Sequence, residues 1–121
     1  MHWPTSAREI VTRTCGCTFC RKHGGVWTSH RDARLAVQVD ERSLVSKYRF
    51  GTETADFHVC KRCGIVPFVV SKIENSDFAV VNVNTLDALD AFTLSNVPTD
   101  FDGEGTDDRL NRRQRNWIQH V

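Results

Sequence analysis

The chain has 121 residues, 40% hydrophobic and 26% charged, which suits one compact domain and leaves too little for two well-packed ones. Sixteen Lys and Arg residues stand against fifteen Asp and Glu residues, and this near balance argues against a general binder of nucleic acid or of acidic membranes. No apolar run approaches the roughly 20 residues that span a bilayer, and the first residues have no signal-peptide or transit-peptide features. We therefore expect a single cytoplasmic domain over residues 1–121, with no nucleic-acid or membrane partner.

Short β-strands are the main elements that the sequence predicts. Apolar residues alternate with polar or small residues over residues 35–39 and 45–50, which is typical of half-buried strands. Further strand-like runs cover residues 57–59, 65–70 and 78–83. The connections are too short for crossover helices, so antiparallel pairing is favoured. The predicted fold is mainly β, with at least five strands.

Helix is a minority element, predicted over residues 85–92 and 107–120. The second helix has an acidic start, and four apolar residues are expected on one of its faces: Leu110, Trp117, Ile118 and Val121. Residues 96–106, with one proline, two glycines and three acids, are predicted to be a mobile surface connection. The arginines of the last helix are interpreted as a solvated face rather than as phosphate contacts: Arg112, Arg113 and Arg115.

All five cysteines lie in two short clusters, a C-x-C-x-x-C triplet at residues 15–20 and a C-x-x-C pair at residues 60–63. The odd number, the close spacing and the lack of an export signal argue against a disulfide framework. A C-x-x-C turn can place two thiolates on one zinc ion, with backbone N–H groups directed at the sulfurs. Two such turns in a β-rich chain predict zinc binding.

Five thiols cannot complete two four-coordinate sites, so two arrangements remain open. In the first, Cys17, Cys20, Cys60 and Cys63 form a closed structural site and leave Cys15 spare. In the second, the triplet holds one zinc and the fourth ligand position stays open. Three ligands with one exchangeable position are the pattern of catalytic zinc. Such a centre should accept an incoming thiol, which loses its proton on binding and remains a nucleophile.

The residues around the cysteines resemble a known family. The run CGCTFCRKHGG, followed by YRFGT, DFHVCKRCG and VVNVN, is similar to the glutathione-dependent formaldehyde-activating enzymes and the related centromere protein V, over about residues 7–95. The resemblance implies an antiparallel β-tent fold with a catalytic zinc on the triplet and a structural zinc on an upstream C-x-C and a downstream C-x-x-C. By this resemblance, Cys15, Cys17 and Cys20 would hold the catalytic zinc, and Cys60 and Cys63 would be half of the structural site.

The chain departs from the family pattern because no cysteine precedes Cys15. The second zinc site, at Cys60 and Cys63, is therefore incomplete. We expect a shortened N-terminus that has lost an opening strand and leaves an unpaired sheet edge. His58, His2 or water are the alternative donors for the second site.

The resemblance implies a carbon–sulfur lyase reaction, in which the glutathione thiol is captured and adds to formaldehyde to form S-hydroxymethylglutathione. Cys15, Cys17 and Cys20 are then the candidate catalytic residues, and glutathione or another small thiol is the partner. Two alternatives stay open. One is a noncatalytic zinc-binding module with the closed four-thiolate site and a protein or chromatin partner, as the centromere-type relatives suggest. The other is a glutathione carrier without turnover.

The substrate-binding residues are not assigned by the sequence. The carboxylates of glutathione need cationic or N–H partners, and four cations lie beside the cysteines: Arg21, Lys22, Lys61 and Arg62. Each can equally be a solvated charge that shields the thiolates. His23 is interpreted as a loop residue, and three aromatic residues are interpreted as core: Trp27, Phe50 and Phe57.

Overall fold

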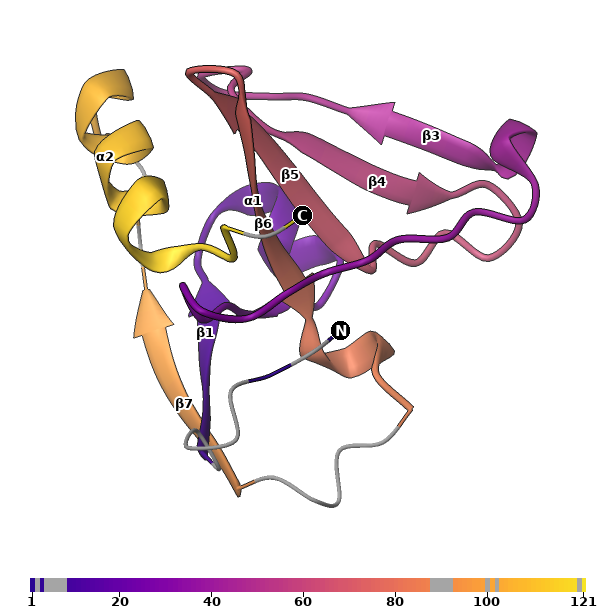
Figure 1. Cartoon of the computed structure of the whole chain (residues 1–121), viewed down its shortest axis with the longest axis horizontal. Helices are drawn as coiled ribbons and strands as arrows, with labels where there is room; N and C mark the ends of the chain where they lie inside the picture. The colour runs from indigo at the N-terminus through magenta and orange to yellow at the C-terminus, as the bar shows by residue number, and fades with distance from the viewer. Residues whose placement is uncertain (2, 4–8, 88–92, 100, 102, 120) are drawn as a thin grey trace.

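The computed structural model describes residues 1, 3, 9–87, 93–99, 101, 103–119 and 121. These residues contain seven strands in one sheet with the order β3-β4-β5-β6-β2-β1-β7 (Figure 1). The strands are β1 (Glu9–Cys15), β2 (Val26–Thr28), β3 (Val45–Tyr48), β4 (Asp56–Cys60), β5 (Phe68–Ile73), β6 (Ser76–Asn82) and β7 (Thr93–Thr99). The helices are α1 (Thr18–Lys22) and α2 (Thr106–Asn116), and two 3-10 turns cover Arg42–Leu44 and Val83–Thr85. The prediction of a mainly β chain with a short C-terminal helix is confirmed.

The sheet is antiparallel except at one edge, where β1 and β7 run parallel from the pair Glu9 and Thr93 to the pair Cys15 and Thr99. In Figure 1, β3 and β4 lie across the view whereas β1 and β7 lie vertically in it, so the two ends of the sheet have different orientations. Because β1 lies between β2 and β7, it is not an unpaired edge. In the described residues, the edges of the sheet are β3 and β7.

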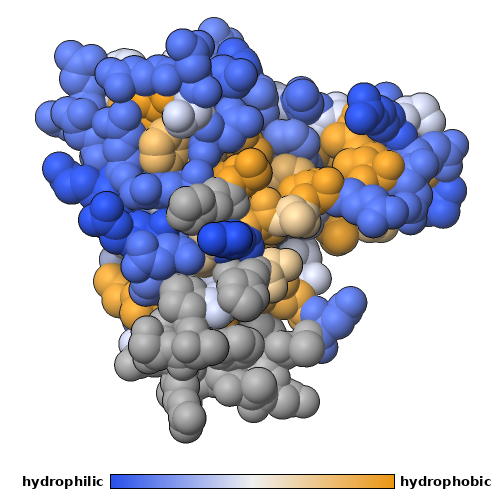
Figure 2. Space-filling view, viewed as in Figure 1, coloured by the Kyte–Doolittle hydropathy of each residue, from blue (hydrophilic) through white to orange (hydrophobic). Residues whose placement is uncertain are grey.

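Strand β6 is buried on both faces and separates two apolar clusters. Phe78 and Val80 belong to one cluster, which also contains Cys20, whereas Ala79 and Val81 belong to the other. This two-sided burial explains the continuous apolar run of β6, because a strand with only one buried face would alternate with polar residues. Figure 2 shows hydrophobic residues gathered where the arm formed by β3 and β4 joins the body of the molecule. The first cluster lies directly beneath the cysteine triplet.

The structure corrects one predicted strand and one predicted connection. Residues 35–39 form no strand: Leu35 is buried, but Val37 and Val39 are 44% and 40% exposed. Of the alternating apolar residues in that segment, only Leu35 therefore packs in the core. Residues 96–99, predicted to be part of a mobile connection, lie in β7. The other predicted strands are found with bounds shifted by a few residues at either end.

The helical predictions are correct only in part. Residues 83–85 form a 3-10 turn, and residues 88–92 of the predicted helix 85–92 lie outside the described residues. Helix α2 ends at Asn116 rather than at residue 120. No helix in the described ranges is long and apolar enough to cross a bilayer.

The segment after α2 is buried by a strand-like contact rather than by a helical face. The backbone N–H of Ile118 donates to the carbonyl oxygen of Ala79 at 2.9 Å, and the N–H of Ala79 donates back to Ile118 at 3.0 Å. Ile118 is fully buried, and Val121 is exposed. The apolar face predicted for this helix is found only at Leu110, which lies in α2 and packs against the first cluster. Trp117 already has extended backbone angles, and the one buried residue of α2 itself is Arg113.

Candidate functional site

The cysteine triplet lies where β1 passes into α1. Cys15 is the last residue of β1, and Cys17 is the N-cap of α1, where its sulfur accepts a hydrogen bond from the backbone N–H of Cys20 at 3.4 Å. Between them, the N–H of Gly16 donates to the carbonyl oxygen of Thr99 in β7 at 2.9 Å. A strand end followed by one helical turn thus directs three thiols to the same place.

The sulfurs of Cys15, Cys17 and Cys20 all lie within 4.8 Å of one another. Two sulfurs on one tetrahedral zinc ion at about 2.3 Å lie about 3.8 Å apart, so the spacing is compatible with zinc. No other group of three or more His, Cys, Asp or Glu side chains comes this close in the part of the chain that the structure describes. Cys60 and Cys63 do not join the triplet, so the closed site of Cys17, Cys20, Cys60 and Cys63 is not formed.

The triplet is crowded and partly shielded from water. Burial raises the pKa of the Cys17 thiol, and the contact with Cys15 together with burial raises the pKa of the Cys20 thiol. Three neighbouring thiolates repel one another and are poorly solvated here, so a bound cation would be needed to ionise all three near neutral pH. Thiolates are soft ligands, and this donor set fits a thiophilic metal ion.

Trp27 contacts the triplet from the core. Its indole Nε1 donates a hydrogen bond to the Cys20 sulfur at 3.3 Å, and the side chain is 6% exposed. A Cβ atom at residue 25 would lie 2.8 Å from the Trp27 ring, so Gly25 allows the indole to pack against the backbone. This close approach is a physical reason for the lack of a side chain at residue 25.

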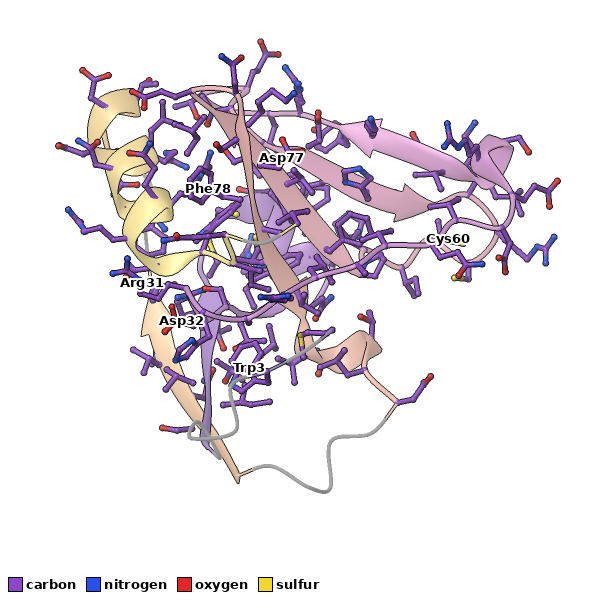
Figure 3. The ribbon with its side chains drawn as sticks, viewed as in Figure 1. Trp3, Arg31, Asp32, Cys60, Asp77 and Phe78 are labelled. Atoms are coloured by element: carbon purple, nitrogen blue, oxygen red, sulfur yellow. The ribbon has the colours of Figure 1, made fainter. Side chains whose placement is uncertain are left out.

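The second cysteine pair forms the predicted C-x-x-C turn at the end of β4. Backbone N–H groups of Cys63 and Arg62 donate to the Cys60 sulfur and lower the pKa of that thiol. The N–H of Gly64 closes the turn on the carbonyl oxygen of Cys60 at 2.7 Å. Figure 3 shows Cys60 at the outer end of the β3–β4 arm. The thiols of Cys60 and Cys63 therefore lie close to each other at that end of the arm.

Among the described residues, no histidine completes a metal site with Cys60 and Cys63. The Nδ1 atom of His58 lies 3.1 Å from the carbonyl oxygen of Asp56, and its ring stacks on Phe68 with centroids 4.4 Å apart. His58 therefore forms no three-ligand group with Cys60 and Cys63. His2 lies outside the described residues.

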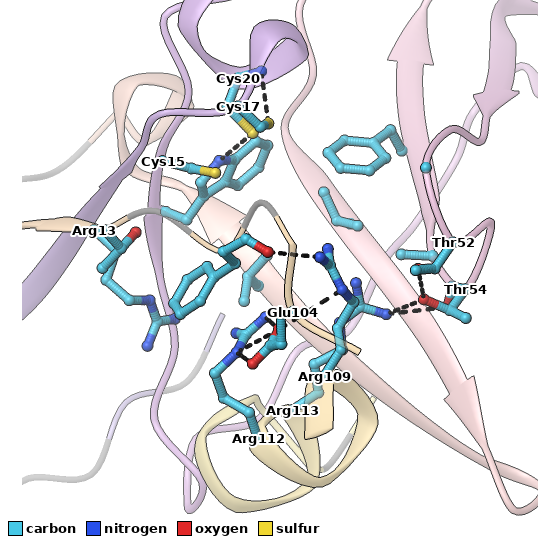
Figure 4. A pocket seen from close by; sticks show the side chains of 18 of the residues that line it. Arg13, Cys15, Cys17, Cys20, Thr52, Thr54, Glu104, Arg109, Arg112 and Arg113 are labelled. Atoms are coloured by element: carbon cyan, nitrogen blue, oxygen red, sulfur yellow. Dashed lines mark hydrogen bonds and ion pairs between the residues drawn. The ribbon is translucent and has the colours of Figure 1, made fainter. Parts of the chain in front are cut away.

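A cavity of about 320 Å³ adjoins the triplet, with all three cysteines in its wall (Figure 4). Small-molecule sites are typically apolar clefts with a few placed polar groups. Five aromatic side chains line this cavity: Trp27, Phe50, Phe57, Phe101 and Trp117. Trp27 is buried as predicted, and it lines the cavity together with Phe50 and Phe57, which are only partly buried.

Arginine side chains form the other end of the cavity. Arg112 binds both carboxylate oxygens of Glu104, with Nη2–Oε1 at 3.0 Å and Nε–Oε2 at 3.1 Å, and its guanidinium lies 3.6 Å above the Phe101 ring centroid. Arg109 donates to the carbonyl oxygen of Phe101 at 2.8 Å and lies 3.6 Å from Glu104. Arg13 in β1 lines the same cavity and donates to Ser29.

Arg113 attaches α2 to the sheet. Its Nη1 donates to Thr54 Oγ1 at 2.7 Å and to Ser71 Oγ at 3.1 Å. Burial, with the neighbouring charges of Arg109 and Arg112, lowers the pKa of Arg113 to about 10. The prediction of a solvated arginine face was thus wrong for Arg112 and Arg113, and correct for Arg115, which is exposed.

The four cations beside the cysteines, for which a ligand contact and a solvated position were both open, do not line the cavity. The side chains of Arg21, Lys22, Lys61 and Arg62 are exposed and lie outside its wall. His23 follows α1 and packs on Phe19 with centroids 4.3 Å apart, as expected of a loop residue. The sequence reasoning missed the arginines of the cavity. The sequence did contain a signal for Arg109 and Arg113. They are four residues apart, and Trp117 follows at the same spacing, so in a helical segment all three would lie on one side.

Comparisons with known proteins support the fold without assigning an activity. No model of a protein family matches the sequence, and no curated protein matches it. A crystal structure of a Rhodobacter sphaeroides protein, solved as a structural genomics target, is similar with a TM-score of 0.52 and 26% identity. The similarity covers 78% of this chain and 87% of that one.

Proposed function

We propose that the protein is a zinc-dependent carbon–sulfur lyase of the glutathione-dependent formaldehyde-activating type, with a β-tent fold. The observation that carries this proposal is the convergence of Cys15, Cys17 and Cys20 on the wall of a cavity of about 320 Å³. No fourth His, Cys, Asp or Glu joins the three sulfurs in the described residues, which leaves a coordination position for an external ligand. A cytoplasmic location is part of the same proposal, since cysteines stay reduced there.

In this proposal, the cysteines hold the ion and the remaining cavity residues hold the ligand. Bound zinc would supply a Lewis acid that favours the thiolate form of the guest thiol at neutral pH. The N–H of Trp27 fixes the position of the Cys20 sulfur, and the aromatic walls exclude water from the thiol. In the overall reaction, the glutathione sulfur forms a bond to the formaldehyde carbon, the C=O π bond breaks, and the oxygen takes the proton released by the thiol.

A glutathione carrier without turnover is a second candidate. Among the described residues, no histidine lines the cavity, and its one carboxylate, Glu104, is engaged by Arg112. The sulfurs therefore face no free general base, which a carrier would not need. The noncatalytic module with a closed four-thiolate site is disfavoured, because Cys60 and Cys63 lie apart from the triplet.

Two measurements test the proposal. In the cobalt-substituted protein, added glutathione should change the sulfur-to-metal charge-transfer bands if its thiol becomes the fourth ligand, and an unchanged spectrum would contradict thiol capture. NMR exchange spectroscopy then measures the rate at which glutathione and formaldehyde equilibrate with their adduct. Acceleration by wild-type protein but not by Cys15→Ser supports the lyase, whereas thiol capture without acceleration supports the carrier.

A further inference from the structure

The arginine end of the cavity carries more positive charge than its one described acidic residue can neutralise. Four arginines and one glutamate are the charged side chains that line it among the described residues, which leaves a formal excess of three positive charges. Arg112 and Arg109 are mostly buried, with side chains 16% and 21% exposed, and Arg113 is 6% exposed. Uncompensated charge in such surroundings is costly and favours a bound anion.

Two of these arginines have hydrogen-bonding capacity that the described residues do not use. The Nε atoms of Arg109 and Arg113 are buried and have no hydrogen-bond partner among the described residues. Arg109 Nε lies 3.6 Å from Glu104, too far for a hydrogen bond. Buried polar groups are normally paired, so the unused donors indicate that the cluster is built for more acceptors than Glu104 supplies.

The Arg112 guanidinium is oriented by Phe101 as well as by its ion pair with Glu104. It stacks on Phe101, so the fork keeps this orientation when the Glu104 carboxylate is absent. Glu104 itself lies on a short connection between β7 and α2, next to Gly103, whose φ of +85° is favourable for glycine. The Glu104 side chain is 19% exposed, so it is partly accessible to solvent.

We propose that this arginine cluster is a carboxylate-binding subsite for the ligand, and that Glu104 occupies the subsite when no ligand is bound. This inference deepens the proposed function and rests on it for the ligand's thiol. The subsite and the cysteine triplet lie in the wall of one cavity (Figure 4), so the ligand class is a small thiol that carries a carboxylate away from its sulfur. Residues 101–113 lie outside the region that carries the family resemblance.

The test uses the zinc-loaded full chain and S-methylglutathione, which keeps both carboxylates but has no free thiol. In calorimetric titrations, Arg112→Gln should weaken binding by about tenfold or more, because a charge-assisted carboxylate contact is lost. Glu104→Gln should strengthen binding by about tenfold, because the internal competitor is gone. Arg115→Gln, on an exposed position of the same helix, is the matched control and should leave the affinity unchanged.

Equal affinities in wild type, Arg112→Gln and Glu104→Gln would overturn the inference. The diethyl ester of S-methylglutathione has no carboxylate, so its binding should not distinguish the three proteins, and discrimination by the ester would also overturn it. Thermal unfolding gives a second measurement, which compares the ligand-induced shift in Tm and so remains valid if Glu104→Gln is less stable than wild type. S-methylglutathione should raise the Tm of that variant more than the Tm of wild type, and an equal or smaller shift contradicts the proposal.

Failure of the proposed function is distinguished from failure of this inference by the Cys15→Ser variant. If the subsite is correct, Cys15→Ser should still bind S-methylglutathione more tightly than its ester, whether or not the wild-type triplet captures thiols. If cobalt spectra show thiol capture that is insensitive to Arg112→Gln, the inference alone is wrong.

Discussion

The indole Nε1 of Trp27 and the sulfur of Cys20 are 3.3 Å apart and joined by a hydrogen bond inside the first core cluster. Hydrogen bonds to metal ligands orient them and tune their affinity, and losing one typically costs about tenfold or more in metal affinity. Trp27→Phe should therefore weaken zinc binding by about tenfold, measured by competition with a chromogenic chelator. Trp117→Phe is the matched control, because Trp117 also lines the cavity. Equal effects of the two variants would contradict this role of the hydrogen bond.

Substitution of single cysteines should separate the two clusters. Cys15→Ser should lose zinc from the triplet, because a three-ligand site depends on each of its thiolates. Cys63→Ser should retain that zinc, because Cys63 is exposed and lies outside the group. Elemental analysis of the purified proteins measures the bound metal. Zinc retained by Cys15→Ser and lost from Cys63→Ser would favour the closed four-thiolate arrangement instead.

Replacement of Arg113 should destabilise the fold. Arg113→Gln removes a buried guanidinium that donates to Thr54 and Ser71, and we expect a loss of about 2 to 3 kcal/mol in the free energy of unfolding. Arg115→Gln, on the exposed side of α2, should change it by less than about 0.5 kcal/mol. Urea unfolding monitored by tryptophan fluorescence gives both values. A loss no larger than that of the control would show that Arg113 does not anchor α2.

The ion pair of Glu104 predicts a dependence of stability on pH. Hydrogen bonds from Arg112 hold the pKa of Glu104 below its usual value of 4.5. A carboxyl group with a lowered pKa in the folded state stabilises the protein above its unfolded pKa, and this contribution disappears as the pH falls through the folded pKa. Wild type should therefore lose more stability than Glu104→Gln as the pH falls below about 4.5.

The stability of wild type and of Glu104→Gln is compared as a difference at each pH, because both proteins release zinc in acid. Urea midpoints measure this difference. Parallel pH profiles would contradict the role of Glu104.

The cysteine triplet could be predicted from sequence because its geometry is local. One strand end and one helical turn bring the three sulfurs together, and no distant residue is needed to set their spacing. Strand β6 could be predicted for a similar reason, since its continuous apolar run from Phe78 to Val81 is typical of a strand buried on both faces. The separation of Cys60 and Cys63 from the triplet is a tertiary property and could not be read from spacing.

The elements that the sequence did not predict depend on distant partners. Strands β1 and β7 are rich in polar residues, and β7 contains Pro98, so intrinsic preference gives little signal for either. Their pairing joins Cys15 to Thr99 across most of the chain. Arg113 was misinterpreted for the same reason, because the hydroxyl groups that make its burial favourable belong to Thr54 and Ser71.

The parallel pairing of β1 with β7 has a consequence for synthesis. On the ribosome, residues 15–20 emerge long before residues 93–117, so a nascent chain holds the three thiols without the strand that flanks them and without the arginines and Trp117 of the cavity wall. The cavity beside the triplet is therefore complete only after the C-terminal segment has left the exit tunnel.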